Sequence, residues 1–221
     1  MNNGPGNLFV VAAPSGTGKT SLVKAIVESL PGTTVSISHT TRQRRPAEVH
    51  GVNYYYIDET EFRHMIADGE FLEHAMVFDN LYGTSRKWVD ETLARGLDVI
   101  LEIDWQGAQQ IQHLFPECIS IFILPPSLQT LADRLLNRGQ DSSGVIHQRL
   151  ADVRESASHI HEFSYVVMND DFTQAKHDLI TIIEAGRLLQ KRQTEKHAKL
   201  LAELTHIKNL SAATQQEDGT A

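Results

Sequence analysis

The sequence has few of the features that mark secreted, membrane or nucleic-acid-binding proteins. Its 221 residues include a single cysteine, Cys118, so no internal disulfide can form and a reducing compartment is expected. No stretch of about 18 apolar residues is present, and a membrane-spanning helix is therefore not expected. The opening segment MNNGPGN carries no basic side chain, which is unlike a secretory leader. Together these absences predict a cytoplasmic location.

Positive charge is also scarce. Lysine and arginine number 20 against 28 acidic residues, and the formal net charge is −8. A general DNA- or RNA-binding surface needs a basic footprint, so this balance argues against nucleic acid as a partner. It does not exclude small anionic ligands, because local geometry can override net charge. The exception is RQRR at residues 42–45, which is either a solvated face or a binding site for an anion.

What the sequence does contain is an alternation of apolar runs and amphipathic segments. The apolar runs are typical of buried parallel strands and occupy residues 8–13, 98–104, 118–124 and 164–170, with a further strand expected over 33–38. Helical periodicity is expected over residues 19–30, 86–94, 127–139, 145–161 and from about 172 onward. This alternation predicts an α/β fold with a doubly wound parallel sheet.

Residues 40–86 depart from the alternation. The segment VNYYYID at 52–58 is rich in aromatics and predicts a short strand, expected to pair antiparallel. The segment ETEFRHMIADGEF at 59–71 predicts a short helix, with Asp58 or Thr60 as its N-cap. We expect these residues to form a small α+β insertion in the core.

The C-terminal part of the sequence is polar. The segment QKRQTEKHAK at residues 190–199 is expected to continue the last helix and to project into solvent. Residues 211–221 are expected to be disordered. The polar helix could equally form a contact in a homo-oligomer, so the sequence leaves the oligomeric state open.

The segment APSGTGKT follows the first apolar run and matches the phosphate-binding pattern G-x-x-x-x-G-K-[ST], except that Ala13 replaces the first glycine. Ala13 is tolerable if it keeps a negative φ. Gly16 and Gly18 let successive N–H groups point into one concavity, and the following helix adds its positive N-terminal end. Lys19 is expected to bridge the β- and γ-phosphates and Thr20 to bind Mg²⁺. The phosphate-holding residues are thus Ala13, Pro14, Ser15, Gly16, Thr17, Gly18, Lys19 and Thr20.

Acidic residues are expected at the end of a neighbouring strand. The segment VILEID places Glu102 and Asp104 at the carboxyl end of a buried strand. Carboxylates there are unfavourable unless they meet a cation. Asp104 is the predicted member of the magnesium shell, through water, with a helix-capping role as the alternative.

A phosphate loop alone does not separate GTPases, ATP-driven motors and small-molecule kinases. The guanine-reading pattern N-K-x-D of GTPases is absent, and the chain is short for a motor with its accessory parts. The insertion with its arginines and tyrosines favours a kinase that binds a second, anionic substrate.

Five segments together resemble guanylate kinase of the bacterial type. They are SISHTTRQRRPAEVHGVNYYY, GEFLEHAMVFDNLYGTS, EIDWQGAQQI, SIFILPPS and VMNDD, and the similarity runs from about Leu8 to Leu189. The resemblance implies transfer of the γ-phosphate of ATP to GMP or dGMP, with Mg²⁺ as the metal.

The resemblance also implies how GMP would be bound. Its phosphate would meet Arg42, Arg45, Tyr54 and Tyr82, and Glu73 would accept hydrogen bonds from the guanine base, as the motifs match. Ser38 and Thr84 match hydroxyl positions that contact guanine, and Glu102 matches a position that is commonly aspartate in the family. The longer side chain leaves the duty of Glu102 open.

For catalysis, the resemblance implies positioning and charge neutralisation by Lys19 and three arginines: Arg134, Arg138 and Arg149. Asn169 matches a position near the adenine ring of ATP.

On the same basis the chain divides into a core with inserted parts. The core comprises residues 1–37, 87–133 and 151–189; residues 38–86 form the GMP-binding insertion, 134–150 the lid, 190–210 a helical extension and 211–221 a tail.

Two other functions stay open: a kinase for a different phosphorylated acceptor, and a non-catalytic binding module of the kind that guanylate-kinase-like domains form.

Overall fold

The central sheet contains five parallel strands in the order β2-β7-β1-β8-β9. The computed structural model describes residues 4–137 and 153–205. The strands are β1 (Leu8–Ala12), β2 (Thr33–Val35), β7 (Asp98–Glu102), β8 (Ile119–Leu124) and β9 (Tyr165–Met168). In the central strand, Val11 pairs with Glu102 on one side and Ile121 on the other. The expected parallel α/β sheet is therefore confirmed.

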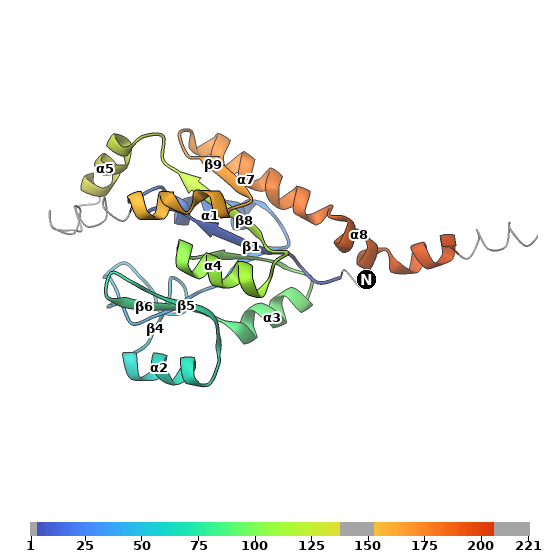
Figure 1. Ribbon diagram of the computed structural model, residues 1–221, viewed down its shortest axis with the longest axis horizontal. Helices are drawn as coiled ribbons and strands as arrows, with labels where there is room; N and C mark the ends of the chain where they lie inside the picture. Colours follow the sequence, from blue (N-terminus) through green and yellow to red (C-terminus); the bar gives the residue numbers. More distant parts are fainter. Residues whose placement is uncertain (1–3, 138–152, 206–221) are drawn as a thin grey trace, which may run out of the picture.

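Helices cover both faces of this sheet (Figure 1). One face packs against α1 (Lys19–Ser29) and α7 (Phe172–Arg187), and the other against α3 (Arg86–Ala94) and α4 (Trp105–Leu114). Side chains of a strand alternate between faces, so Phe9 and Val11 join the first core and Val10 joins the second. The helix α5 (Leu128–Asn137) follows β8, and the hydroxyl of the preceding Ser127 accepts the Thr130 N–H at 3.0 Å.

The insertion forms a second sheet in the order β4-β3-β6-β5, which lies beside α2 (Figure 1). Its elements are β3 (His39–Thr40), β4 (Tyr55–Tyr56), α2 (Glu59–Ala67), β5 (Phe71–Val77) and β6 (Asn80–Ser85). Asp58 caps α2 by accepting the Glu61 N–H at 2.8 Å, which confirms the first of the two expected caps.

The expected antiparallel pairing of the aromatic strand is wrong. Tyr55 and Tyr56 pair parallel to His39 and Thr40, and the regular strand is only these two residues long. The loop over residues 41–54 carries the chain back to the end where β3 begins, so β4 runs in the same direction as β3.

The β5–β6 hairpin was not predicted. Its two-residue turn consists of Phe78 (φ 47) and Asp79 (φ 60), both in the left-handed region. Tight hairpin turns need such angles and usually contain glycine or asparagine, so Phe-Asp gives no recognisable turn signal. This hairpin nevertheless carries two predicted site residues, Glu73 and Thr84.

The C-terminal helix is neither continuous nor wholly solvated, contrary to expectation. It stops at Arg187, and α8 (Gln190–Lys196) follows Leu188 and Leu189 before a further helical stretch at 198–205. Arg192 in α8 is only 14% exposed and pairs with the fully buried Asp98.

Asp98 is the anchor for this arrangement. It accepts the Asn7 N–H at 2.8 Å and the Arg187 Nε–H at 2.7 Å, in addition to its contact with Arg192. A buried carboxylate needs such compensation, and here it draws the N-terminus, α7 and α8 onto one strand.

Parts of the expected organisation lie outside the described residues: 145–152 of the helix predicted over 145–161, most of the lid, and the tail at 211–221. Within the described residues, 153–158 are helical.

Replacing Asp98 with alanine should lower the free energy of unfolding by about 3 kcal/mol or more, because two arginines lose their buried counter-charge. Urea denaturation followed by circular dichroism measures this. The exposed Asp90→Ala on α3 is the control, expected within about 0.5 kcal/mol of the parent. Equal stability of the two variants would show that Asp98 does not anchor the C-terminal helices.

Candidate functional site

The phosphate loop connects β1 to α1 at the carboxyl edge of the sheet. Gly16 (φ 92) and Gly18 (φ 93) both adopt left-handed angles that favour glycine. Among the described residues the non-glycine positions with positive φ are Phe78 and Asp79, so Ala13 keeps the negative φ that the motif requires. The alanine is thus compatible with the loop conformation.

Asn169 supports the loop from the end of β9. Its buried amide donates to the Thr17 carbonyl at 2.6 Å, and the Thr17 hydroxyl donates to the Pro14 carbonyl at 2.9 Å. A Cβ on Gly18 would lie 2.7 Å from the Asn169 amide nitrogen. The family resemblance implies a position near the adenine ring for Asn169, which stays a prediction; the structure shows a contact with the loop that the sequence did not indicate.

Lys19 points toward the end of β7. Its Nζ donates to the Ile103 carbonyl at 2.6 Å. Burial lowers the pKa of Lys19, while the negative charges of Glu102, Asp104 and Glu73 act in the opposite direction. The Lys19 ammonium lies among carboxylates at the entrance of the phosphate loop. It is suited to bind a ligand that carries more negative charge than a single carboxylate does.

The carboxylate that meets Thr20 is Glu102, which accepts a hydrogen bond from the threonine hydroxyl. Asp104 instead caps α4: one of its oxygens accepts the Gly107 N–H at 2.9 Å and the other accepts from Gln106 at 3.1 Å. The capping alternative is therefore realised, and a water-mediated magnesium role for Asp104 stays a prediction.

Glu73 lies at the bottom of the site and is 3% exposed. The Thr84 hydroxyl donates to its Oε1 at 2.5 Å. Burial raises the pKa of Glu73 to about 7, and the nearby Asp104 adds to this, although the Thr84 hydrogen bond and Lys19 act against it. A buried carboxylate with a strongly raised pKa is a frequent property of binding and catalytic sites.

Helix α4 closes the site behind Glu73. A Cβ on Gly107 would lie 2.5 Å from the Glu73 Oε2, so only glycine lets the carboxylate pack against this helix. Gln110, one turn further on, donates to the His74 carbonyl at 2.8 Å and accepts the His74 N–H at 3.2 Å. Helix α4 therefore joins the core to the insertion strand that carries Glu73.

Arg42 lies against the predicted tyrosines. Its guanidinium carbon is 5.4 Å from the centre of the Tyr54 ring, and the Tyr54 and Tyr82 rings are 5.8 Å apart. Burial raises the pKa of Tyr54, so this hydroxyl stays a neutral hydrogen-bond donor. The structure thus brings together three of the four residues expected to bind the GMP phosphate.

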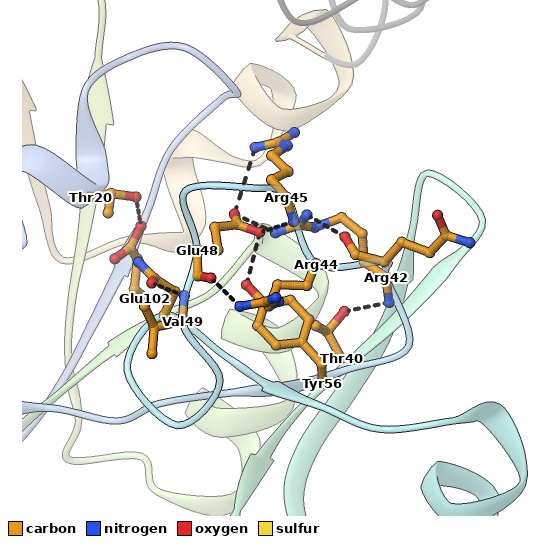
Figure 2. A network of polar contacts seen from close by, with 11 residues as sticks. Thr20, Thr40, Arg42, Arg44, Arg45, Glu48, Val49, Tyr56 and Glu102 are labelled. Atoms are coloured by element: carbon orange, nitrogen blue, oxygen red, sulfur yellow. Dashed lines mark hydrogen bonds and ion pairs between the residues drawn. The ribbon is translucent and has the colours of Figure 1, made fainter.

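Glu48 was missed by the sequence analysis, although it lies in one of the quoted motifs. Figure 2 shows its carboxylate between Arg42, Arg45 and Tyr56. It accepts from Arg42 Nη2, from the Arg45 backbone N–H and from the Tyr56 hydroxyl, each at 2.8 Å. A signal was available: a lone glutamate three residues after an arginine run.

The remaining predicted residues are placed less fully. The Ser38 carbonyl accepts the Tyr55 N–H at 2.9 Å. Arg134 lies in α5, where the structure does not describe its side chain, and Arg138 and Arg149 lie outside the described residues.

The donors fit a magnesium ion that is held mainly by substrate phosphates. Within residues 4–137 and 153–205, no group of three or more His, Cys, Asp or Glu side chains is arranged to ligate a metal. Mg²⁺ in phosphate-transfer sites usually keeps several waters and takes few protein ligands, as the Thr20 hydroxyl and neighbouring carboxylates would allow.

Within residues 4–137 and 153–205, none of the helices combines the length and apolar character that spanning a membrane requires.

Comparison with known proteins gives a consistent result. The family model "Guanylate kinase" matches residues 5–186. The chain is 54% identical to a guanylate kinase of Coxiella burnetii over 198 residues, covering 90% of this chain and 96% of the relative. It is 52% identical to one from Pseudomonas fluorescens over 204 residues, covering 92% and 99%.

A solved structure agrees with these matches. The crystal structure of guanylate kinase from Anaplasma phagocytophilum is 30% identical and covers 87% of this chain and 92% of its own, with a TM-score of 0.74. With the phosphate loop and the fold as expected, the predicted family is confirmed: the chain belongs to the guanylate kinase family.

Proposed function

We propose that this chain transfers the γ-phosphate of ATP to GMP, and to dGMP, with the site residues in the roles described below. Membership of the family makes it an ATP:GMP phosphotransferase, with ATP as co-substrate. The observation that best supports guanine as the acceptor base is the buried Glu73 carboxylate with its Thr84 hydrogen bond. The single cysteine and the family together support a cytoplasmic location.

Glu73 is suited to distinguish guanine from adenine. Guanine presents its N1–H and its N2 amine side by side, and an ionised carboxylate can accept from both. Adenine has an unprotonated N1. This nitrogen is an acceptor, and it would face a carboxylate oxygen that is also an acceptor. Sites that depend on such hydrogen bonds discriminate strongly because a wrong base leaves buried groups unpaired. Thr84 orients the carboxylate, and Ser38 supplies a further hydroxyl.

Arg42, Arg45, Tyr54 and Tyr82 would bind the GMP phosphate within the insertion at 38–86. Guanidinium groups offer paired donors that match phosphate oxygens, and neutral tyrosine hydroxyls add donors without further charge. Arg42 already lies on the Tyr54 ring. GMP would then extend from this clamp to Glu73.

The loop at residues 13–20 would hold the ATP phosphates through its backbone N–H groups and the N-terminus of α1. Lys19 would leave the Ile103 carbonyl and neutralise charge between the β- and γ-phosphates. The attacking oxygen of GMP is already ionised, so no general base is needed. Bound Mg²⁺, near Thr20, Glu102 and Asp104, would neutralise phosphate charge.

Arg134, Arg138 and Arg149 remain family-based assignments for the transition state, with residues 134–150 as the lid over ATP. Catalysis by this set is positioning and electrostatic stabilisation. A non-catalytic binding module is disfavoured because Gly16, Gly18 and Lys19 are all retained.

The acceptor specificity can be tested with GMP, dGMP, AMP, UMP and dTMP, each with ATP and Mg²⁺, by following ADP release. We expect turnover with GMP and dGMP alone. Preference for another acceptor would contradict the role of Glu73.

Lys19→Met should lower kcat by at least about 100-fold, because the lysine stabilises the charge of the phosphoryl group as it is transferred. The surface variant Lys24→Met on the same helix should keep full activity.

Glu73→Gln should raise the KM for GMP by about 10- to 100-fold, because the amide offers one acceptor where guanine presents two donors. The KM for ATP should change little. Steady-state kinetics with each substrate varied in turn would show the difference. An equal rise in both KM values would mean that the substitution disturbs the whole site.

The raised pKa of Glu73 also predicts a pH-dependent stability of the nucleotide-free protein. A carboxyl whose pKa is about 7 when folded and 4.5 ordinarily binds its proton more tightly in the folded state. Its contribution to stability is therefore present below pH 4.5 and is lost as the pH rises through 7. Glu73→Gln has no such loss, so its melting temperature relative to the parent should be higher at pH 8 than at pH 5. The exposed Glu59→Gln should show no such trend; a parallel trend in both would contradict the assignment.

A further inference from the structure

A carboxylate is an unexpected occupant of a phosphate-binding cluster, because it repels the phosphate and competes for the same arginine. Glu48 nevertheless lies at the centre of the cluster that Figure 2 shows, and its side chain is 16% exposed. Its presence there calls for a physical reason.

Both oxygens of Glu48 are occupied by donors from three places in the insertion. Oε1 accepts from the Arg42 guanidinium, and Oε2 accepts from the Arg45 backbone N–H and the Tyr56 hydroxyl. Burial alone would raise the pKa of Glu48, but these hydrogen bonds lower it to about 2. The carboxylate is therefore ionised at neutral pH.

The backbone of Glu48 adds two further contacts. Its N–H donates to the Arg45 carbonyl at 3.0 Å, and its carbonyl accepts from the Arg44 guanidinium at 2.9 Å. The residue thus closes the loop from 42 to 48 through both its side chain and its main chain.

These contacts hold Arg42 more firmly than Arg45, the other arginine assigned to the phosphate. The Arg42 side chain is 17% exposed, and its guanidinium is held over the Tyr54 ring at 5.4 Å and the Tyr56 ring at 5.8 Å. The Arg45 guanidinium is 3.9 Å from Glu48 at its nearest, and its side chain is 40% exposed. One arginine is held in place before GMP arrives, and the other has room to move onto the phosphate.

We propose that Glu48 is a positioning residue for GMP: it holds the Arg42 guanidinium and the loop at 42–48 in the shape that receives the phosphate. The inference rests on the proposed function, since it assumes that Arg42 binds the GMP phosphate. An arginine has five N–H donors, of which Glu48 takes one at Nη2 and the Gln43 carbonyl takes one at Nη1. Donors therefore remain for the substrate while Glu48 stays in place.

The opposite role, a competitor that GMP must displace, makes the opposite prediction. A competitor lowers the affinity for GMP, so its removal tightens binding. A positioning residue reduces the ordering that binding requires, so its removal weakens binding. The sign of the change in KM separates the two.

Glu48→Gln keeps the shape and one acceptor oxygen but removes the charge. We expect the KM for GMP to rise about tenfold, equivalent to about 1.4 kcal/mol, with kcat and the KM for ATP nearly unchanged. The ratio of kcat/KM for GMP to kcat/KM for AMP should also be unchanged, because Glu73, which is proposed to recognise the base, is not altered. A residue that merely stabilised the fold would not move the KM for GMP alone.

Glu59→Gln is the matched control, since Glu59 also pairs with an arginine in the insertion, Arg63, but on the exposed side of α2. It should leave every constant unchanged. Tyr56→Phe removes only one hydroxyl donor to Glu48 and should raise the KM for GMP by a smaller factor. This milder variant carries the test if Glu48→Gln does not fold.

An unchanged or lower KM for GMP in the folded Glu48 variant would overturn the inference, as would an unchanged KM in Tyr56→Phe if that variant carries the test. Failure of the unsubstituted protein to phosphorylate GMP would instead overturn the proposed function.

Discussion

The site depends on one partly buried cation, Lys19, among carboxylates. Lys19 lies within the electrostatic reach of Glu102, Asp104 and Glu73, and these three come from the end of β7, the start of α4 and the insertion strand β5. Lys19 itself comes from the phosphate loop. Lys19, which is assigned to the ATP phosphates, therefore interacts with the carboxylates assigned to the metal and to guanine, and the two proposed substrate sites share one electrostatic environment.

Several carboxylates can lie around the proposed anion-binding site because each one accepts a hydrogen bond from its own donor. Thr20 donates to Glu102, the Gly107 N–H to Asp104, Thr84 to Glu73, and Arg42 to Glu48. Each carboxylate keeps its charge, but the donor beside it offsets part of the field that the carboxylate exerts on an approaching phosphate. This arrangement is compatible with the binding of anions by a chain of net charge −8.

The features that the sequence could predict are those determined by nearby residues. The phosphate loop, the Asp58 cap and the buried strands each follow from a few adjacent side chains. The parallel course of β4 and the docking of α8 depend on long-range pairing, such as that of Asp98 with Arg192, and no local pattern indicates it. For Glu48 the nearby arginine run was a local signal, but its contact with Tyr56 forms only when the loop folds back.

Helix α4 shows how the fold converts these separate contacts into one site. Its first turn holds Asp104 as the N-cap and Gly107 against Glu73, and its second turn holds Gln110 on the backbone of His74. The strand end beside Lys19 and the carboxylate assigned to guanine are thus kept in register by a single element. Helix α4 thus sets the spacing between the end of β7, where Lys19 donates to the Ile103 carbonyl, and the Glu73 carboxylate that packs against Gly107.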